Sequence, residues 1–170
     1  NKLTSLKGSP KEVGYHFACS YNKLTSLKGS PKEVGEDFYC SYNQITSLKG
    51  SPQKIGRNFD CSKNKLTSLE GAPQEVGGNF NCYNNKLTSL EGSPKEIGGF
   101  FDCGNNQLTS LKGAPWKIDG EFFYFGNENL TEYKIKAYRT FLKLSDSKKI
   151  PLTKDGHYYP TEEWENSFKE

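Results

Sequence analysis

The sequence is poor in the residues that most catalytic sites use. Among its 170 residues there is no methionine, and the only histidines, His16 and His157, stand near opposite ends of the chain. Ser20 lies close to His16, but a nucleophilic triad also needs an orienting group and an oxyanion hole, and the sequence suggests neither. No glycine-rich phosphate loop occurs. We therefore expect no catalytic residues and no cofactor, and we predict that the protein is not an enzyme.

Long apolar runs are also missing. Hydrophobic residues make up 33% of the chain, and no stretch approaches the roughly 20 apolar residues of a membrane-spanning helix. No basic start followed by an apolar segment suggests a signal peptide, although the chain begins within a repeat and a preceding segment stays open. Aromatic residues at 14% argue against disorder. We expect a folded protein with no membrane partner.

Neither sign of charge dominates. The 23 Lys and Arg residues and 20 Asp and Glu residues give a net charge of +3. A nucleic-acid-binding domain usually concentrates its basic residues in one stripe. The lysines here are interrupted by glutamates such as Glu12, Glu33 and Glu70, which predicts a mixed and solubilising edge. We therefore expect no nucleic-acid partner.

Five cysteines occur in no pattern typical of metal sites or disulfides. Cys19, Cys40, Cys61, Cys82 and Cys103 stand 21 residues apart, and Tyr124 takes the sixth place. Clustered spacings such as C-x-x-C are absent, and equivalent positions in a stack do not favour the geometry of a bridge. We predict no metal site, and we interpret the five as buried reduced thiols that act as small apolar side chains. Reduced thiols favour a cytoplasmic location.

What the sequence has in abundance is repetition with a period of 21 residues. One unit is N-K-L-T-S-L-K-G-S-P-K-E-V-G-x-x-F-x-C-x-x, and its asparagine recurs at Asn1, Asn22, Asn43, Asn64, Asn85, Asn106 and Asn127. Leucine, Val/Ile and phenylalanine columns follow the same period. Such a period is typical of a solenoid, in which stacked units bury a core that one unit cannot bury alone. We predict six tandem repeats over residues 1–126, with the asparagines forming a hydrogen-bonded ladder.

Each repeat contains one clear strand signal. Phe-x-Cys alternates with a period of two, which predicts a short strand with Phe and Cys pointing inward and their neighbours outward. Glycine and Ser/Ala-Pro pairs punctuate the rest of the unit, so the return path is expected to be extended or turn-like, without helix. The fold class is therefore predicted to be a β-rich solenoid.

These strand segments resemble a known family. "FACSYNKL", "FYCSYNQI" and "FNCYNNKL" are similar to the L-x-L-x-x-N-x-L segment of leucine-rich repeats, with Phe and Cys in two apolar places. The short unit resembles the tandem leucine-rich repeats of phage and bacterial proteins. The resemblance implies a leucine-rich-repeat right-handed superhelix with a parallel concave sheet and a non-helical convex side. It also implies protein binding.

The repeats differ most beside the Phe-x-Cys core, at positions expected on the concave face. Carboxylates and aromatic side chains gather there without any Lys or Arg, which suits a protein partner with a basic or apolar surface. The candidate partner-binding residues are Asp37, Tyr39, Asn58, Asp60, Asn79, Asn81, Tyr83, Phe100, Asp102, Glu121, Phe123 and Phe125. Asp60 and Asp102 would lie two repeats, roughly 10 Å, apart, and nothing in the sequence indicates a raised pKa for either.

The repeat pattern ends near residue 126. Residues 127–170 are predicted to form a C-terminal cap, since a solenoid needs its exposed end covered. A helix is expected in "NLTEYKIKAYRTFLKL" with Thr131 as N-cap, and a second, short helix in "PTEEWENSFKE" with Thr161 as N-cap.

The sequence as a whole predicts a non-catalytic protein-binding module that uses its concave strand face. The resemblance extends this to a phage protein in the host cytoplasm that binds and modulates a host or defence protein. The alternative is a structural or assembly component of a virion or cell surface. The oligomeric state stays open.

Overall fold

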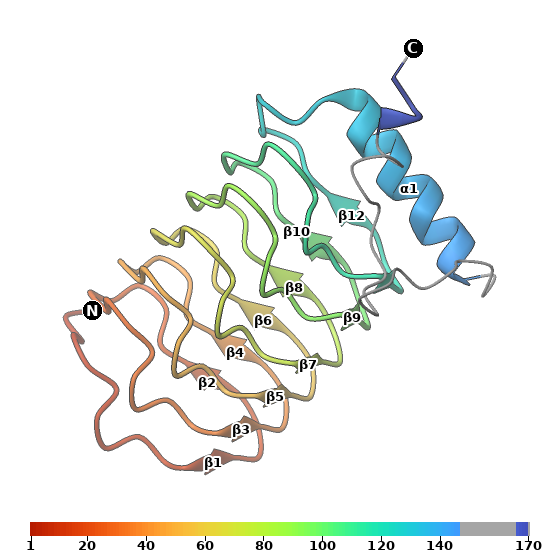
Figure 1. Ribbon diagram of the computed structural model, residues 1–170. Helices are drawn as coiled ribbons and strands as arrows, with labels where there is room; N and C mark the ends of the chain where they lie inside the picture. Colours follow the sequence, from red (N-terminus) through yellow and green to blue (C-terminus); the bar gives the residue numbers. More distant parts are fainter. Residues whose placement is uncertain (147–165, 170) are drawn as a thin grey trace.

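The repeats stack into a parallel β-solenoid with two sheets. The structure is a computed structural model, and it describes residues 1–146 and 166–169. Each repeat contributes one strand to each sheet. The strands lie side by side along the stack, which extends from the N-terminal end to a helix at the far end (Figure 1). No helix occurs between residues 1 and 126, all of which the structure describes. The prediction of a β-rich solenoid with a non-helical return path is confirmed.

Both sheets are parallel and six-stranded. The Val/Ile sheet consists of β1 (Glu12–Val13), β3 (Glu33–Val34), β5 (Lys54–Ile55), β7 (Glu75–Val76), β9 (Glu96–Ile97) and β11 (Lys117–Ile118). The Phe sheet consists of β2 (Phe17–Ala18), β4 (Phe38–Tyr39), β6 (Phe59–Asp60), β8 (Phe80–Asn81), β10 (Phe101–Asp102) and β12 (Phe122–Phe123). The sequence indicated the strand of the Phe sheet but did not single out the Val/Ile strand within the extended return path. In the Val/Ile sheet a single Val or Ile is followed at once by Gly or Asp, so no second inward residue shows a period of two as Phe-x-Cys does.

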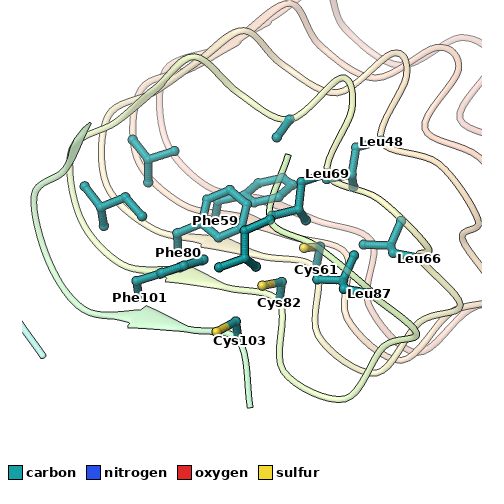
Figure 2. Packing of buried hydrophobic residues seen from close by; sticks show 14 of the residues in the cluster. Leu48, Phe59, Cys61, Leu66, Leu69, Phe80, Cys82, Leu87, Phe101 and Cys103 are labelled. Carbon is teal, nitrogen blue, oxygen red and sulfur yellow. The ribbon is translucent and has the colours of Figure 1, made fainter. Parts of the chain in front are cut away.

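The register of both sheets places like residues on like. Phe38 pairs with Phe59, and Val34 pairs with Ile55, one repeat further along the chain. The Phe, Cys and Leu columns therefore form ladders that fill the interior of the solenoid (Figure 2). Ring centroids of Phe38 and Phe59 lie 5.7 Å apart, within the range of favourable aromatic pairs. The few apolar residues of each repeat suffice because neighbouring repeats complete the core.

The asparagine column is the ladder that the sequence predicted. Asn64 is buried, and its Oδ1 accepts the backbone N–H of Ile45 in the preceding repeat at 3.0 Å. Its Nδ2 donates to the carbonyl oxygens of Cys40 at 3.0 Å and Cys61 at 3.1 Å. Each amide thus joins the backbones of two adjacent turns, which a hydroxyl or carboxylate could not do in the same geometry.

All five cysteines are buried free thiols, as predicted. Burial raises the pKa of Cys19 to about 12 and also raises the pKa of the thiols further inside the stack. These side chains face the core beside the leucines and are neutral there.

One glycine column is required by close contact between turns. A Cβ added to Gly56 would lie 1.9 Å from the carbonyl oxygen of Gly35, and at Gly35 it would lie 2.2 Å from the carbonyl oxygen of Gly14. Both contacts are with backbone, which cannot rotate away. Glycine at this position therefore permits the spacing of the turns immediately after the Val/Ile sheet.

A single α-helix covers the C-terminal end of the described stack. Helix α1 (Glu132–Asp146) begins directly after Thr131, whose carbonyl oxygen accepts the N–H of Ile135 at 3.3 Å. The buried hydroxyl of Tyr138 donates to the carbonyl oxygen of Pro115 at 2.6 Å, and its ring meets Phe122 edge-on at 5.0 Å. The predicted first helix of the cap is confirmed. The second helix predicted from Pro160 onward lies largely outside the described residues.

None of the helices in the described part of the chain is long and apolar enough to cross a membrane.

Candidate functional site

The candidate residues lie in three columns on the outward side of the Phe sheet, which we call the outer Phe-sheet face. Its middle column runs through one residue of each strand, and the register pairs Tyr39 with Asp60, Asp60 with Asn81, Asn81 with Asp102 and Asp102 with Phe123. The flanking columns are the residues immediately before each Phe and immediately after each Cys. The structure therefore brings together on one surface residues that are up to 88 positions apart in sequence, from Asp37 to Phe125.

The column before each Phe holds adjacent turns together. Oδ1 of Asp37 accepts the backbone N–H of Asn58 at 3.0 Å and its side-chain Nδ2 at 2.8 Å. Oδ1 of Asn58 accepts the N–H of Asn79 at 2.8 Å, and Oδ1 of Asn79 accepts the N–H of Phe100 at 2.9 Å. Sequence reasoning placed these residues on the face but missed this second ladder. Its signal was a run of Asp and Asn at one position of successive repeats.

The polar residues of the middle column cap the turn that follows each strand. Asp60 accepts the N–H of Ser62 at 2.9 Å, and Asp102 accepts the N–H of Gly104 at 2.9 Å. Asn81 makes the same bond with Tyr83 at 3.0 Å. Only Oδ1 takes part in each case, so each carboxylate keeps its other oxygen for a further interaction.

A network of polar side chains around Asp37 lies at the N-terminal end of the face. His16 lies between two carboxylates, with its Nδ1 2.9 Å from Asp37 and its Nε2 2.9 Å from Glu36. Tyr39 donates its hydroxyl to Asp37 at 2.9 Å. Burial alone would raise the pKa of Asp37, but the hydrogen bonds from Asn58 and Tyr39 and the nearby Arg57 and His16 outweigh it and lower that pKa.

The carboxylate of Asp37 therefore already has its hydrogen-bonding partners within the protein. Asp37 is only 4% exposed, and its carboxylate accepts hydrogen bonds from Asn58 and Tyr39 with Arg57 and His16 nearby. The sequence offered no sign of this network, because His16, Glu36 and Arg57 become neighbours of Asp37 only when the turns stack.

The other carboxylates of the face have no such compensation. Among the residues that the structure describes, Asp60, Asp102 and Glu121 form no ion pair. Partial burial raises the pKa of Asp102, and the charge of Asp60 two turns away adds to this effect. The raised pKa was not foreseen from the sequence, since it depends on how far the strand withdraws the side chain from water.

Aromatic side chains gather toward the C-terminal half of the face. Phe100 meets Phe123 edge-on, with ring centroids 5.8 Å apart. Phe125 is 68% exposed and stacks on Tyr124 at 4.8 Å. The hydroxyl of Tyr83 accepts a hydrogen bond from Nδ2 of Asn105 at 2.8 Å. These rings form an apolar surface directly beside Asp102 and Glu121.

A further aromatic row borders the face and was missed from the sequence. Tyr21 and Tyr42 stack with centroids 4.3 Å apart, and the ammonium group of Lys63 lies 4.4 Å from the Tyr42 centroid and donates to its hydroxyl. All three residues have positive φ, between 53° and 58°. Only the stacked turns bring them into a row, because each side chain follows a different strand.

Within the described ranges, no group of three or more His, Cys, Asp or Glu side chains could hold a metal ion.

Comparisons of this chain with protein-family models, with curated proteins and with solved structures found no match.

Proposed function

We propose that this protein is a non-catalytic module that binds another protein through its outer Phe-sheet face. The observation that carries the proposal is the pair of uncompensated carboxylates, Asp60 and Asp102, set beside an aromatic surface on a hydrogen-bonded scaffold. In the proposal the partner presents a basic group together with apolar side chains. Tyr39, Tyr83, Phe100, Phe123 and Phe125 supply the aromatic contacts.

The electrostatic part of the proposal follows from desolvation. A carboxylate that is partly removed from water without a cation nearby is destabilised in its charged form, which the raised pKa of Asp102 reflects. A Lys or Arg of a partner would remove this cost and gain charge-assisted hydrogen bonds to the unused oxygens of Asp60 and Asp102. Complementary charge of this kind favours specificity and rapid association.

The apolar part rests on the exposed ring of Phe125 and on half-buried rings beside it that are held in fixed positions. Aromatic residues at the centre of an interface often contribute most of the binding energy. Phe100 and Phe123 support each other through their edge contact, so little side-chain entropy is lost when a partner covers them. Asp37, Asn58 and Asn79 have a different part in the proposal, since they hold the strands at the spacing that presents these side chains.

We also propose a repeat family, a cellular location and an origin for the protein. We propose that the solenoid is a leucine-rich-repeat superhelix whose concave side is the outer Phe-sheet face, on the basis of its Asn ladder and buried Leu columns. The five free thiols suit the cytoplasm. The similarity of the short unit to phage repeats leads us to propose a phage protein that binds and modulates a host or defence protein.

The experiment is an affinity capture with matched variants. Tagged wild-type protein is exposed to a bacterial lysate, and the proteins retained are compared with those retained by the double variant Asp60→Lys and Asp102→Lys. We expect at least one protein that wild type retains and the double variant does not. The matched control is Glu70→Lys with Glu91→Lys, two exposed residues away from the face, which changes the net charge equally and should retain that protein. Equal capture by wild type and the face variant would contradict the proposal.

A further inference from the structure

A second surface, separate from the outer Phe-sheet face, concentrates positive charge. A cleft of about 680 Å³ lies over the first two turns, between the leucine columns and the Val/Ile sheet. Four lysines line it in two stacked pairs, Lys7 with Lys28 and Lys11 with Lys32, and its other lining residues are Ser, Thr, Gly and Pro. No carboxylate is among them. A volume of this size matches a small-molecule ligand.

The later turns treat the column of Lys7 differently. Where a lysine occupies the column of Lys7, a glutamate of the neighbouring turn faces it: Lys49 lies 3.0 Å from Glu70, and Lys112 lies 2.8 Å from Glu91. The mixed and solubilising edge expected from the sequence is therefore present in those turns.

The first two turns depart from this rule. Lys7 and Lys28 occupy equivalent positions of adjacent turns, as do Lys11 and Lys32, and none of the four forms an ion pair with a described residue. Like charges directly opposite one another in neighbouring strands are destabilising. Water screens the repulsion between these lysines, but their arrangement becomes favourable only when an anion lies between the pairs.

The groups around the lysines are suited to an oxyanion. Thr4, Ser5 and Ser26 line the cleft together with Gly8 and Gly29. A Cβ at Gly8 would meet nothing within 4 Å, so the backbone there is open to close approach, whereas Gly29 is packed against the backbone of Leu6. Lysine binds phosphate as a flexible point charge, and hydroxyl groups can donate to the remaining oxygens. Four ammonium groups in two pairs exceed what one carboxylate or one phosphate group would neutralise.

We propose that this cleft binds a small ligand that carries two or more linked phosphate groups. The two members of each pair lie one turn apart, and neighbouring turns of a parallel stack are about 4.8 Å apart, so a linked chain of phosphates can contact both turns at once. The site is independent of the protein-binding face, because the two surfaces share no residue.

The test is calorimetric titration of the full chain with inorganic tripolyphosphate, beside titrations with ATP and with a single-stranded oligonucleotide. The cleft variant carries Lys7→Gln, Lys11→Gln, Lys28→Gln and Lys32→Gln. The control carries Lys65→Gln, Lys86→Gln, Lys95→Gln and Lys143→Gln, four exposed lysines outside the cleft, so that both variants lose the same charge. Far-ultraviolet circular dichroism verifies that each variant is folded.

We expect wild type to bind one tripolyphosphate, the cleft variant to bind it about tenfold more weakly or worse, and the control to change by about twofold or less. Binding of ATP with the same dependence on the cleft lysines would support the proposal. Absence of tripolyphosphate binding, or equal weakening in both variants, would overturn it. Binding of the oligonucleotide alone would also overturn it, since that result indicates an extended polyanion surface in place of a small-ligand site.

Discussion

Replacing one asparagine of the buried ladder should cost much more stability than replacing Asn22 near the N-terminal end of the same ladder. Asn64→Ala removes the acceptor of the Ile45 N–H, which has no other partner, and three bonds donated by Nδ2. The three carbonyl oxygens each keep a second donor: Asn43 for Cys40, Asn85 for Cys61 and the Tyr42 N–H for Ser62. Only the Ile45 N–H is left unsatisfied in a buried position.

The magnitude follows from this inventory. An unsatisfied buried N–H costs about 1–3 kcal/mol, and each of the other lost hydrogen bonds contributes about 0.5–1.5 kcal/mol at most. Because the three carbonyls keep partners, we expect the lower end of that second range. The free energy of unfolding should therefore fall by about 2–5 kcal/mol, a large part of the stability of an ordinary domain.

Asn22→Ala is the matched control. Its Oδ1 accepts the N–H of Leu3 at 2.9 Å, but this bond is exposed, so water can replace the lost acceptor. We expect a loss of about 1 kcal/mol or less. Urea unfolding followed by circular dichroism measures both values. Equal losses for Asn22→Ala and Asn64→Ala would refute the ladder as a source of stability that depends on burial.

Three further predictions concern the scaffold and its charges. Gly56→Ala should lower the free energy of unfolding by at least about 2 kcal/mol, because its Cβ would meet the carbonyl oxygen of Gly35. At Gly14 a Cβ would have nothing within 4 Å, so Gly14→Ala should change the free energy of unfolding by about 0.5 kcal/mol or less. Equal effects of the two variants in urea unfolding would count against the close contact. Asp102→Asn should raise stability at pH 7, because the raised pKa means that the charged form is disfavoured in the folded state. The gain should shrink as the pH falls through the folded pKa toward the ordinary value, and a gain that persists unchanged at low pH would disprove the cause. An alkylating reagent should modify none of the five cysteines in the folded protein and all five after unfolding, as read by intact mass; fewer than five modifications of the unfolded chain would reveal bridged pairs.

Asp37 and Asp102, two acidic residues of the face, also affect stability in opposite ways as the pH changes. The stability that Asp37 supplies is fully present above its unfolded pKa, and it is lost as the pH falls through the lowered folded value. The cost that Asp102 imposes is present above its raised folded pKa and disappears on acidification. The same side chain thus stabilises the fold where neighbours compensate it and destabilises the fold where they do not.

How much the sequence predicts depends on whether a feature repeats. Phe59, Cys61 and Asn64 could be placed correctly because each recurs every 21 residues, and a ladder of like residues has one obvious structural explanation. The Val/Ile sheet could not be predicted, because Ile55 has no second inward apolar residue beside it, as Phe59 has in Cys61, and because the pairing depends on contact between turns. The sequence indicated Gly56, which follows Ile55, only as a turn residue.

The candidate site divides in the same way. That Asp60, Asp102 and Phe123 share a surface follows from the register of the repeat. What each side chain does there depends on contacts between turns that no spacing encodes, such as the pair of bonds from Asn58 that occupies Asp37. His16, Glu36 and Arg57 stand at positions that vary between repeats, so no repeating column of the sequence predicted their network.

The most direct test of the proposed protein-binding face is the dissociation constant of a purified captured partner for the double variant Asp60→Asn and Asp102→Asn. Asparagine keeps the oxygen that caps Ser62 and Gly104, so the fold is preserved and only the two uncompensated charges are removed. We predict binding weaker by about tenfold, mainly at low salt, where charge pairs contribute most. An unchanged dissociation constant in the double variant at every salt concentration would contradict the proposed role of the face.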